Sequence, residues 1–200
     1  IRGATELKVY LLEEQLILSD FMPILEDVGL RVVAANPYEV QLPNESGTIY
    51  MFAVQDHQKR KLSVGNGGAL LAETILASRS GDVVSDSLNA LVLSAGLHWR
   101  EVDVLRGYLG YAFQVGAVPS RLSIRAALIQ YPNIARELFE LFVAKFNPDS
   151  SSTRQDRLAE AAQLRKAFFH SLGQVSALAD DRALRSLEQL ISATVRTNYY

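Results

Sequence analysis

The sequence predicts an α+β protein in which a small unit of strands and helices over residues 1–80 precedes a mostly helical domain over residues 81–200. Two observations predict this division. Short β-prone runs separated by turn formers occupy the first part, whereas apolar residues recur at helical spacing through the second. The content of 48% hydrophobic and 21% charged residues is that of an ordinary globular chain and argues against disorder.

A helix is expected after the first strand, which covers residues 7–11. Ser19 and Asp20 can cap this helix. Gly29 can end it, because glycine readily adopts the left-handed conformation that satisfies the last carbonyls of a helix. The buried face is predicted by four apolar residues at i, i+3, i+4 and i+7: Phe21, Ile24, Leu25 and Val28.

Two further strands and a helix complete the first unit. The strand that follows the helix is expected to stop at Pro37, because proline lacks the N–H that a ladder needs. Residues 38–42 and 48–54 flank a turn-forming segment and predict an antiparallel hairpin. With a helix over residues 68–78, the order β-α-β-β-α is most of a ferredoxin-like unit whose last strand is not evident.

Six helices are expected in the second part, where glycine and proline provide the breaks between them. Apolar residues at helical spacing predict them over residues 86–97, 100–115, 120–131, 133–146, 154–178 and 180–195.

Composition excludes several classes of function. The absence of cysteine removes thiol nucleophiles, thiolate zinc sites and iron–sulfur clusters, and it favours a reducing compartment, so we expect a cytoplasmic protein. A net charge of -2 predicts no nucleic-acid partner. The sequence has no run of about 18 apolar residues and no signal peptide, so no membrane partner is expected. It begins without Met and ends directly after a helical pattern, which indicates a fragment.

No catalytic or metal-binding motif emerges from the sequence. The glycine-rich residues 65–68 lack the Lys-Ser/Thr of a phosphate-binding loop and are interpreted as an ordinary loop. His57, His98 and His170 show no metal-ligand spacing. His98 can cap the preceding helix, His170 is expected either on a helix surface or in packing, and Trp99 is interpreted as a packing anchor. We therefore predict no catalytic, cofactor-binding or metal-binding residue in this chain.

One helix carries a polar stripe with two open interpretations. Arg100, Arg106, Tyr108 and Tyr111 recur along residues 100–115, beside an apolar stripe suited to a core. These side chains can form an interface with another domain, and a solvated helix face gives the same pattern.

Several segments, in the same order, resemble the large bacterial NAD-specific glutamate dehydrogenases. Residues 19–32 and 37–40 are similar to the ACT-like unit in the N-terminal region of that family. Residues 86–108, with Trp99-Arg100 and Leu105-Arg106, resemble its helical region, and residues 196–200 resemble its junction to the catalytic domain.

The resemblance implies that the chain is a regulatory and linking portion that precedes a catalytic domain. That domain interconverts glutamate and 2-oxoglutarate with ammonia by hydride transfer to or from NAD. The resemblance implies no cofactor in this chain and NAD in the full-length enzyme. The implied partners are the remaining domains of the same polypeptide, an amino-acid effector, and further copies in a homo-oligomer. The alternative is a ligand-free structural module for subunit assembly.

Two groups of site residues follow from the resemblance. ACT modules bind small amino acids near helix–strand junctions, which makes four residues the expected effector-facing positions: Ser19, Asp20, Gly29 and Leu30. Contact with other domains is expected from six residues: Trp99, Arg100, Arg106, Arg196, Asn198 and Tyr199. The helices between the two groups are expected to transmit effector binding to the catalytic domain.

Overall fold

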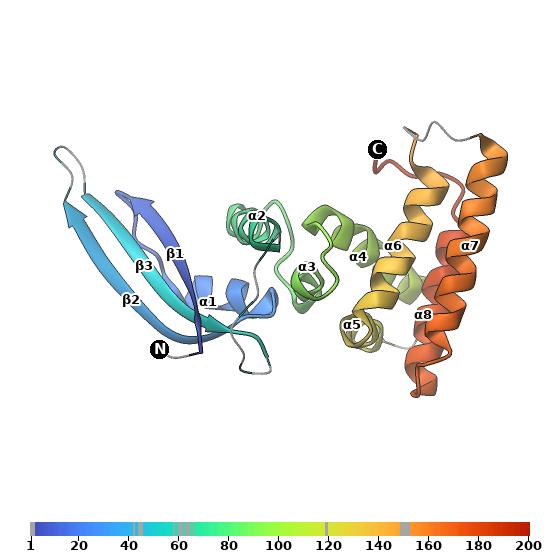
Figure 1. Cartoon of the computed structure of the whole chain (residues 1–200), viewed down its shortest axis with the longest axis horizontal. Helices are drawn as coiled ribbons and strands as arrows, with labels where there is room; N and C mark the ends of the chain where they lie inside the picture. The colour runs from blue at the N-terminus through green and yellow to red at the C-terminus, as the bar shows by residue number, and fades with distance from the viewer. Residues whose placement is uncertain are drawn as a thin grey trace. The chain divides into compact units, whose positions relative to one another are not determined.

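The structure is a computed structural model that describes residues 3–41, 43, 46–57, 59, 62, 65, 67–118, 120–148 and 153–200. The chain divides into two compact units, Ile1–Leu93 and Ser94–Tyr200. The first unit contains the sheet, and the described residues of the second form helices and their connections (Figure 1). The predicted α+β class is confirmed.

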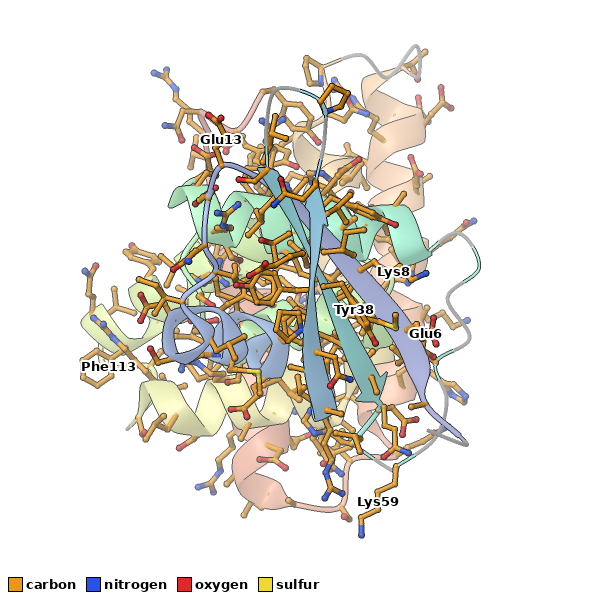
Figure 2. All side chains as sticks on the ribbon, turned by 90° about the vertical axis from the view of Figure 1, so that its left-hand side faces the viewer. Glu6, Lys8, Glu13, Tyr38, Lys59 and Phe113 are labelled. Carbon is orange, nitrogen blue, oxygen red and sulfur yellow. The ribbon has the colours of Figure 1, made fainter. Side chains whose placement is uncertain are left out.

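Three antiparallel strands form the sheet of the first unit: β1 (Thr5–Leu12), β2 (Arg31–Gln41) and β3 (Ser46–Gln55). Their order is β1-β3-β2, so β3 is central and the predicted hairpin is β2–β3. The described residues supply no fourth strand. The register places Ile49 between Tyr10 and Tyr38. Side chains of β1, including Glu6 and Lys8, and Tyr38 of β2 are drawn in Figure 2.

The expectation that Pro37 ends a strand is wrong. β2 continues through Pro37, which pairs with Tyr50 of β3. The physical reason is the position of β2 at the edge of the sheet, because a residue without an N–H is tolerated where no further strand needs a donor.

Two helices pack on one face of this sheet, α1 (Leu18–Asp27) and α2 (Gly67–Ser80). The N-cap position of α1 is Ile17, which makes no side-chain hydrogen bond there, so the expected cap by Ser19 and Asp20 is wrong. The predicted stop at Gly29 is confirmed, with φ +88°. The core between helices and sheet consists of apolar residues from both layers: Leu11, Leu16, Phe21, Leu25, Val28, Leu30, Tyr50, Phe52, Val54, Leu71 and Ile75.

A short 3-10 turn, η1 (Ser87–Ala90), and one turn of α-helix, α3 (Leu91–Ser94), follow α2. The predicted helix over residues 86–97 is therefore shorter and broken. Asp86 accepts a hydrogen bond from the Leu88 backbone N–H at 3.0 Å, which caps the 3-10 turn.

The part of the second unit that the structure describes contains five helices: α4 (Trp99–Gln114), α5 (Arg121–Gln130), α6 (Pro132–Phe146), α7 (Arg154–Leu172) and α8 (Leu178–Ala193). Helix α6 contacts α4, α5, α7 and α8 and carries much of the core, including Leu138 and Phe142. α7 ends at Leu172, earlier than predicted, with Gly173 at its C-cap. In the described part of the chain, no helix combines the length and apolar character required to cross a bilayer.

Candidate functional site

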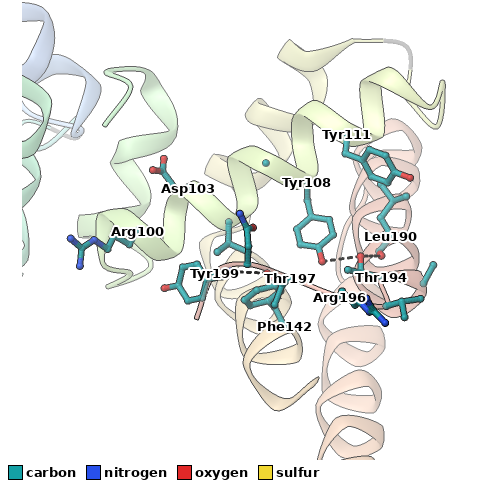
Figure 3. Close-up of a pocket in the computed structure, with 15 residues that line it drawn as sticks. Arg100, Asp103, Tyr108, Tyr111, Phe142, Leu190, Thr194, Arg196, Thr197 and Tyr199 are labelled. Carbon is teal, nitrogen blue, oxygen red and sulfur yellow. Dashed lines mark hydrogen bonds between the residues drawn. The ribbon is translucent and has the colours of Figure 1, made fainter. Parts of the chain in front are cut away.

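A cavity of about 900 Å³ lies in the second unit, between α4, α8, Phe142 of α6 and the segment 194–199 that follows α8. Figure 3 shows the side chains that line it. Apolar side chains such as Leu190 and Val195 form part of the wall, and arginine, aspartate, tyrosine, threonine and asparagine side chains line other parts. Below, "the α4–α8 groove" denotes this cavity.

The first turn of α4 is fixed by a capping box. His98 Nδ1 accepts a hydrogen bond from the Arg100 backbone N–H at 3.2 Å. Glu101 Oε2 accepts one from the His98 backbone N–H at 2.8 Å. His98 therefore caps the helix that follows it, and the expectation that it caps the preceding helix is wrong. The capping box holds the helix turn from which Arg100 and Asp103 line the groove.

Phe142 holds the segment after α8 against α6. Its side chain is 2% exposed, and its ring centroid lies 5.5 Å from that of Tyr199 in an edge-on arrangement. The rings of Tyr108 and Tyr200 lie 6.1 Å and 6.4 Å from the same centre. Aromatic pairs at such separations stabilise a contact beyond simple burial. The C-terminal segment is therefore a wall of the groove that packs against Phe142 and, through Tyr199, also against Phe139, whose ring centroid lies 6.4 Å away.

A chain of hydrogen bonds joins α4 to the end of α8. Tyr108 Oη donates to Thr194 Oγ1 at 2.9 Å, and Thr194 Oγ1 donates to the Leu190 carbonyl at 2.7 Å. Burial raises the pKa of the Tyr108 phenol, and the hydrogen bond with Thr194 opposes this effect. The phenol therefore stays neutral and keeps its proton for the hydrogen bond near neutral pH.

Lys145 of α6 caps the C-terminal end of α8. Its Nζ donates to the carbonyls of Ile191 and Ser192, at 3.2 Å and 2.5 Å. A cation at this position complements the partial negative charge of a helix C-terminus. Partial burial lowers the pKa of the Lys145 amine.

The structure brings four of the six predicted interdomain residues into the lining of the groove: Arg100, Arg196, Asn198 and Tyr199. The other two lie beside it. Trp99 is half-buried, and the Arg100 guanidinium carbon lies 4.8 Å from its ring centre. Arg106 forms an ion pair with Asp103, which lines the groove. Residues from positions near 100 and near 196 therefore share one site.

Most residues that line the groove were not among the predicted site residues, and Phe142, Leu190 and Thr194 are examples. Phe142 and Leu190 fit the apolar faces expected for their helices, so the sequence signals burial at these positions and nothing more. Thr194 had no recognisable signal, because its partner Tyr108 lies 86 positions earlier in the chain.

The structure does not bring the four expected effector-facing residues together. Ser19 and Asp20 are exposed near the start of α1, whereas Gly29 and Leu30 follow its end, about 15 Å away for a helix of ten residues. Leu30 is 1% exposed. A Cβ added to Gly29 would lie 3.4 Å from the Ala90 Cβ, so protein atoms already occupy the space next to this glycine.

A smaller cavity of about 240 Å³ opens at the start of α1 and includes Asp20. Glu14 of the β1–α1 connection and Arg79 of α2 form an ion pair at its edge. The Leu16 backbone N–H at this cavity donates to Tyr50 Oη at 3.3 Å. The cavity thus has a cation and a carboxylate at its rim and an apolar floor that includes Phe21 and Ile24.

The chemistry available at these sites is that of recognition. Arginine guanidinium groups, a phenol and aromatic faces are suited to contacts with carboxylates and protein surfaces. Within the described ranges, no group of three or more His, Asp or Glu side chains could hold a metal ion. His170 is exposed on α7, which is the first of the two positions expected for it.

Comparison with known proteins gives two family matches in succession. Residues 2–66 match the family described as "Glutamate dehydrogenase, ACT3 domain", and residues 83–148 match "Glutamate dehydrogenase, helical motif 3". The first match covers the sheet of the first unit, and the second extends from the turn after α2 to the end of α6.

Three relatives are described as NAD-specific glutamate dehydrogenase. The protein of Halomonas elongata is 34% identical over 183 residues, which is 92% of this chain and 11% of the relative. The protein of Pseudomonas aeruginosa is 36% identical over 194 residues, 96% of this chain and 12% of the relative. The protein of Mycobacterium tuberculosis is 33% identical over 205 residues, 100% of this chain and 12% of the relative. The chain thus spans only a small part of each relative's length.

Proposed function

Because this chain belongs to the family of large NAD-specific glutamate dehydrogenases, we propose that it is a non-catalytic regulatory and linking part of such an enzyme. The observation that carries the proposal is the succession of an ACT3 match and a helical motif 3 match along the chain. In this proposal the whole enzyme is cytoplasmic and converts glutamate, NAD and water to 2-oxoglutarate, ammonia and NADH. Its NAD site and its catalytic residues lie in other parts of the polypeptide.

We assign the α4–α8 groove as the contact with the remaining domains. Its rim carries Arg100 and Arg196, and Arg196 makes no ion pair with any described residue. Tyr199 is 38% exposed at the same rim. Arginine and tyrosine are enriched at protein interfaces and among the residues that dominate their binding energy. A groove with these side chains therefore suits an acidic or carbonyl-rich surface of a neighbouring domain.

The test of this assignment is a charge reversal in the full-length enzyme. Arg196→Glu is expected to reduce kcat or to weaken subunit assembly, because it places a carboxylate where an acidic surface should dock. Arg182→Glu is the matched control, since Arg182 is an exposed arginine of α8 outside the groove. NADH formation and sedimentation velocity measure the two properties. If Arg196→Glu behaves like the control in both, the groove is not a domain contact.

We further propose that an amino-acid effector binds at the start of α1, with Ser19 and Asp20 at the site. The cavity of about 240 Å³ and the exposed first turn of the helix support this end of α1 over the buried Gly29–Leu30 end. Calorimetric titration of the chain with each common amino acid is the test. We expect heat from at least one of them, and heats equal to those of buffer for all would refute the site.

The helices of the second unit would then transmit the effector signal to the catalytic domain. Deletion of residues 154–195 from the full-length enzyme is expected to abolish the effector response or assembly. The alternative, a ligand-free assembly module, predicts no heat with any amino acid and loss of the oligomer in the deletion variant. If the deletion variant keeps its activity, its effector response and its assembly unchanged, these helices act only as spacers.

A further inference from the structure

The α4–α8 groove follows one stripe of α4. Five residues of this helix line it at i, i+3, i+4, i+7 and i+11: Arg100, Asp103, Val104, Gly107 and Tyr111. At a rise of 1.5 Å per residue, this stripe is about 16 Å long. The opposite wall consists of the end of α8 and the segment 194–199. The groove therefore runs along about three turns of α4.

Gly107 is the point at which another backbone can come closest to α4. This glycine is exposed in the interior of the helix, and a Cβ added to it would meet no atom of the described chain within 4 Å. Glycine weakens a helix interior relative to alanine, and close approach of another backbone is one of its uses. An occupant whose backbone lies against α4 here explains why glycine stands at this position.

Backbone hydrogen bonding selects a helix as the occupant. The interiors of α4 and α8 satisfy their own N–H and C=O groups, so of the described walls only the segment 194–199 can offer backbone groups. An extended chain in the groove would leave many of its backbone groups unpaired, whereas a helix pairs its own. Packed helices lie with their axes about 8–10 Å apart, and a small residue at the contact favours the shorter distance.

Charge selects an acidic occupant. The charged side chains that line the groove are Arg100, Asp103 and Arg196, and Asp103 forms an ion pair with Arg106. Neither Arg100 nor Arg196 forms an ion pair with a residue that the structure describes. Figure 3 shows these two arginines at opposite ends of the groove. Guanidinium groups pair strongly with carboxylates, so an acidic segment complements both ends.

We propose that the α4–α8 groove accommodates an acidic α-helix from another part of the same polypeptide, with its backbone next to Gly107 and carboxylates at Arg100 and Arg196. The relatives are long, and this chain spans only 11–12% of each of them. A helix tethered in the same polypeptide binds at a high effective concentration, which favours it over a second copy of this chain. The inference rests on the proposed function of the groove as a domain contact.

The first test is photo-cross-linking in a full-length glutamate dehydrogenase that contains this chain. The photoreactive p-benzoylphenylalanine replaces Tyr111, which lines the groove and is 50% exposed. Replacement of Phe113 is the matched control, because Phe113 is 42% exposed on the same helix and is not part of the groove lining. Mass spectrometry of the digested enzyme identifies each linked peptide.

The probe at position 111 is expected to link within one subunit to a peptide from outside this chain, with acidic residues at helical spacing. The probe at position 113 should not link to that peptide. No link from position 111, the same linked peptide from both positions, or a cross-linked product of twice the subunit mass would overturn the proposal.

The second test fills the space at Gly107 in the same enzyme. Gly107→Leu should abolish most of the cross-link from position 111, because overpacking separates the two helices. Gly110→Leu is the matched control and should keep the cross-link, since Gly110 also has open space at its Cβ and is not part of the groove lining. Equal cross-linking in both variants would refute close approach at Gly107.

Failure of this inference is distinguishable from failure of the proposed function. If Arg196→Glu impairs the enzyme while position 111 gives no link to a helix, the groove is a domain contact that holds no helix, and only the present inference is refuted. If Arg196→Glu behaves like its control and position 111 gives no link, both assignments are refuted.

Discussion

Replacement of Phe142 by alanine tests how the α4–α8 groove is held together. Phe142 is 2% exposed and packs against five aromatic rings, those of Tyr108, Phe139, Phe146, Tyr199 and Tyr200. Replacing a buried phenylalanine by alanine costs about 3–5 kcal/mol. We expect the lower end, about 3 kcal/mol, because the partly exposed rings of the C-terminal segment can move into the space.

Urea titration followed by the fluorescence of Trp99 measures this loss. Trp99 is the single tryptophan and lies in the second unit, so its signal reports on the unit that the substitution affects. Phe142→Leu is the control, since it keeps most of the apolar volume and should lose about 1 kcal/mol. A loss below about 1 kcal/mol for Phe142→Ala would refute the view that this side chain anchors the groove.

The same substitution should release the segment that follows α8. Trypsin cleaves after arginine, and Arg196 is exposed in this segment. We expect Phe142→Ala to accelerate cleavage after Arg196 relative to cleavage after Arg182. In the variant, the segment after α8 can open locally without breaking a contact between residue 142 and Tyr199. Equal acceleration at both sites would mean that the whole unit is destabilised and that the segment has no anchor of its own.

Three further perturbations have expected outcomes that the structure determines. Gly29→Ala should lower the free energy of unfolding of the first unit by about 1–2 kcal/mol, because other residues are strained at positive φ; unchanged urea unfolding followed by circular dichroism would contradict this. Arg165→Ala should cost about 2 kcal/mol in urea titrations of the second unit, since Glu188 is 1% exposed and loses its ion-pair partner at 2.8 Å. A loss near zero would show that water replaces the guanidinium, which is itself half-exposed. Burial raises the pKa of Tyr108, so its contribution to stability is complete below about pH 10 and is lost as the pH rises through the folded-state pKa. Tyr108→Phe should therefore lose less stability than the unaltered chain as the pH rises above about 10, and equal slopes would contradict the assignment.

Local patterns predicted the elements of the first unit well, because their causes are local. Gly29 ends α1 at positive φ, as the helix-stop pattern indicates, and the turn formers before β3 predict the hairpin. The prediction of a strand end at Pro37 is wrong because the tolerance of proline depends on which strand lies at the edge, and this requires knowledge of the sheet order. His98 was assigned to the wrong helix because its Nδ1 can cap only the helix whose first N–H groups it reaches.

The candidate site was harder to predict because it depends on contacts between distant segments. Resemblance pointed to Arg100 and Arg196 separately, and only the packing of α4 against α8 places both at one groove. Phe142, which holds the groove wall, has no sequence feature beyond helical apolar spacing. The four expected effector-facing residues do not form one site for the same kind of reason. Ser19 lies in the first turn of α1, and Leu30 follows the opposite end of this helix.

NADH formation from glutamate and NAD tests the central claim most directly. It should be measured at equal molar concentration for the 200-residue chain alone and for a full-length glutamate dehydrogenase that contains it. The account predicts turnover by the full-length enzyme and none by the chain alone, because the chain supplies recognition and linkage without the reacting groups. Turnover by the isolated chain, or a full-length protein that does not reduce NAD with glutamate, would contradict it.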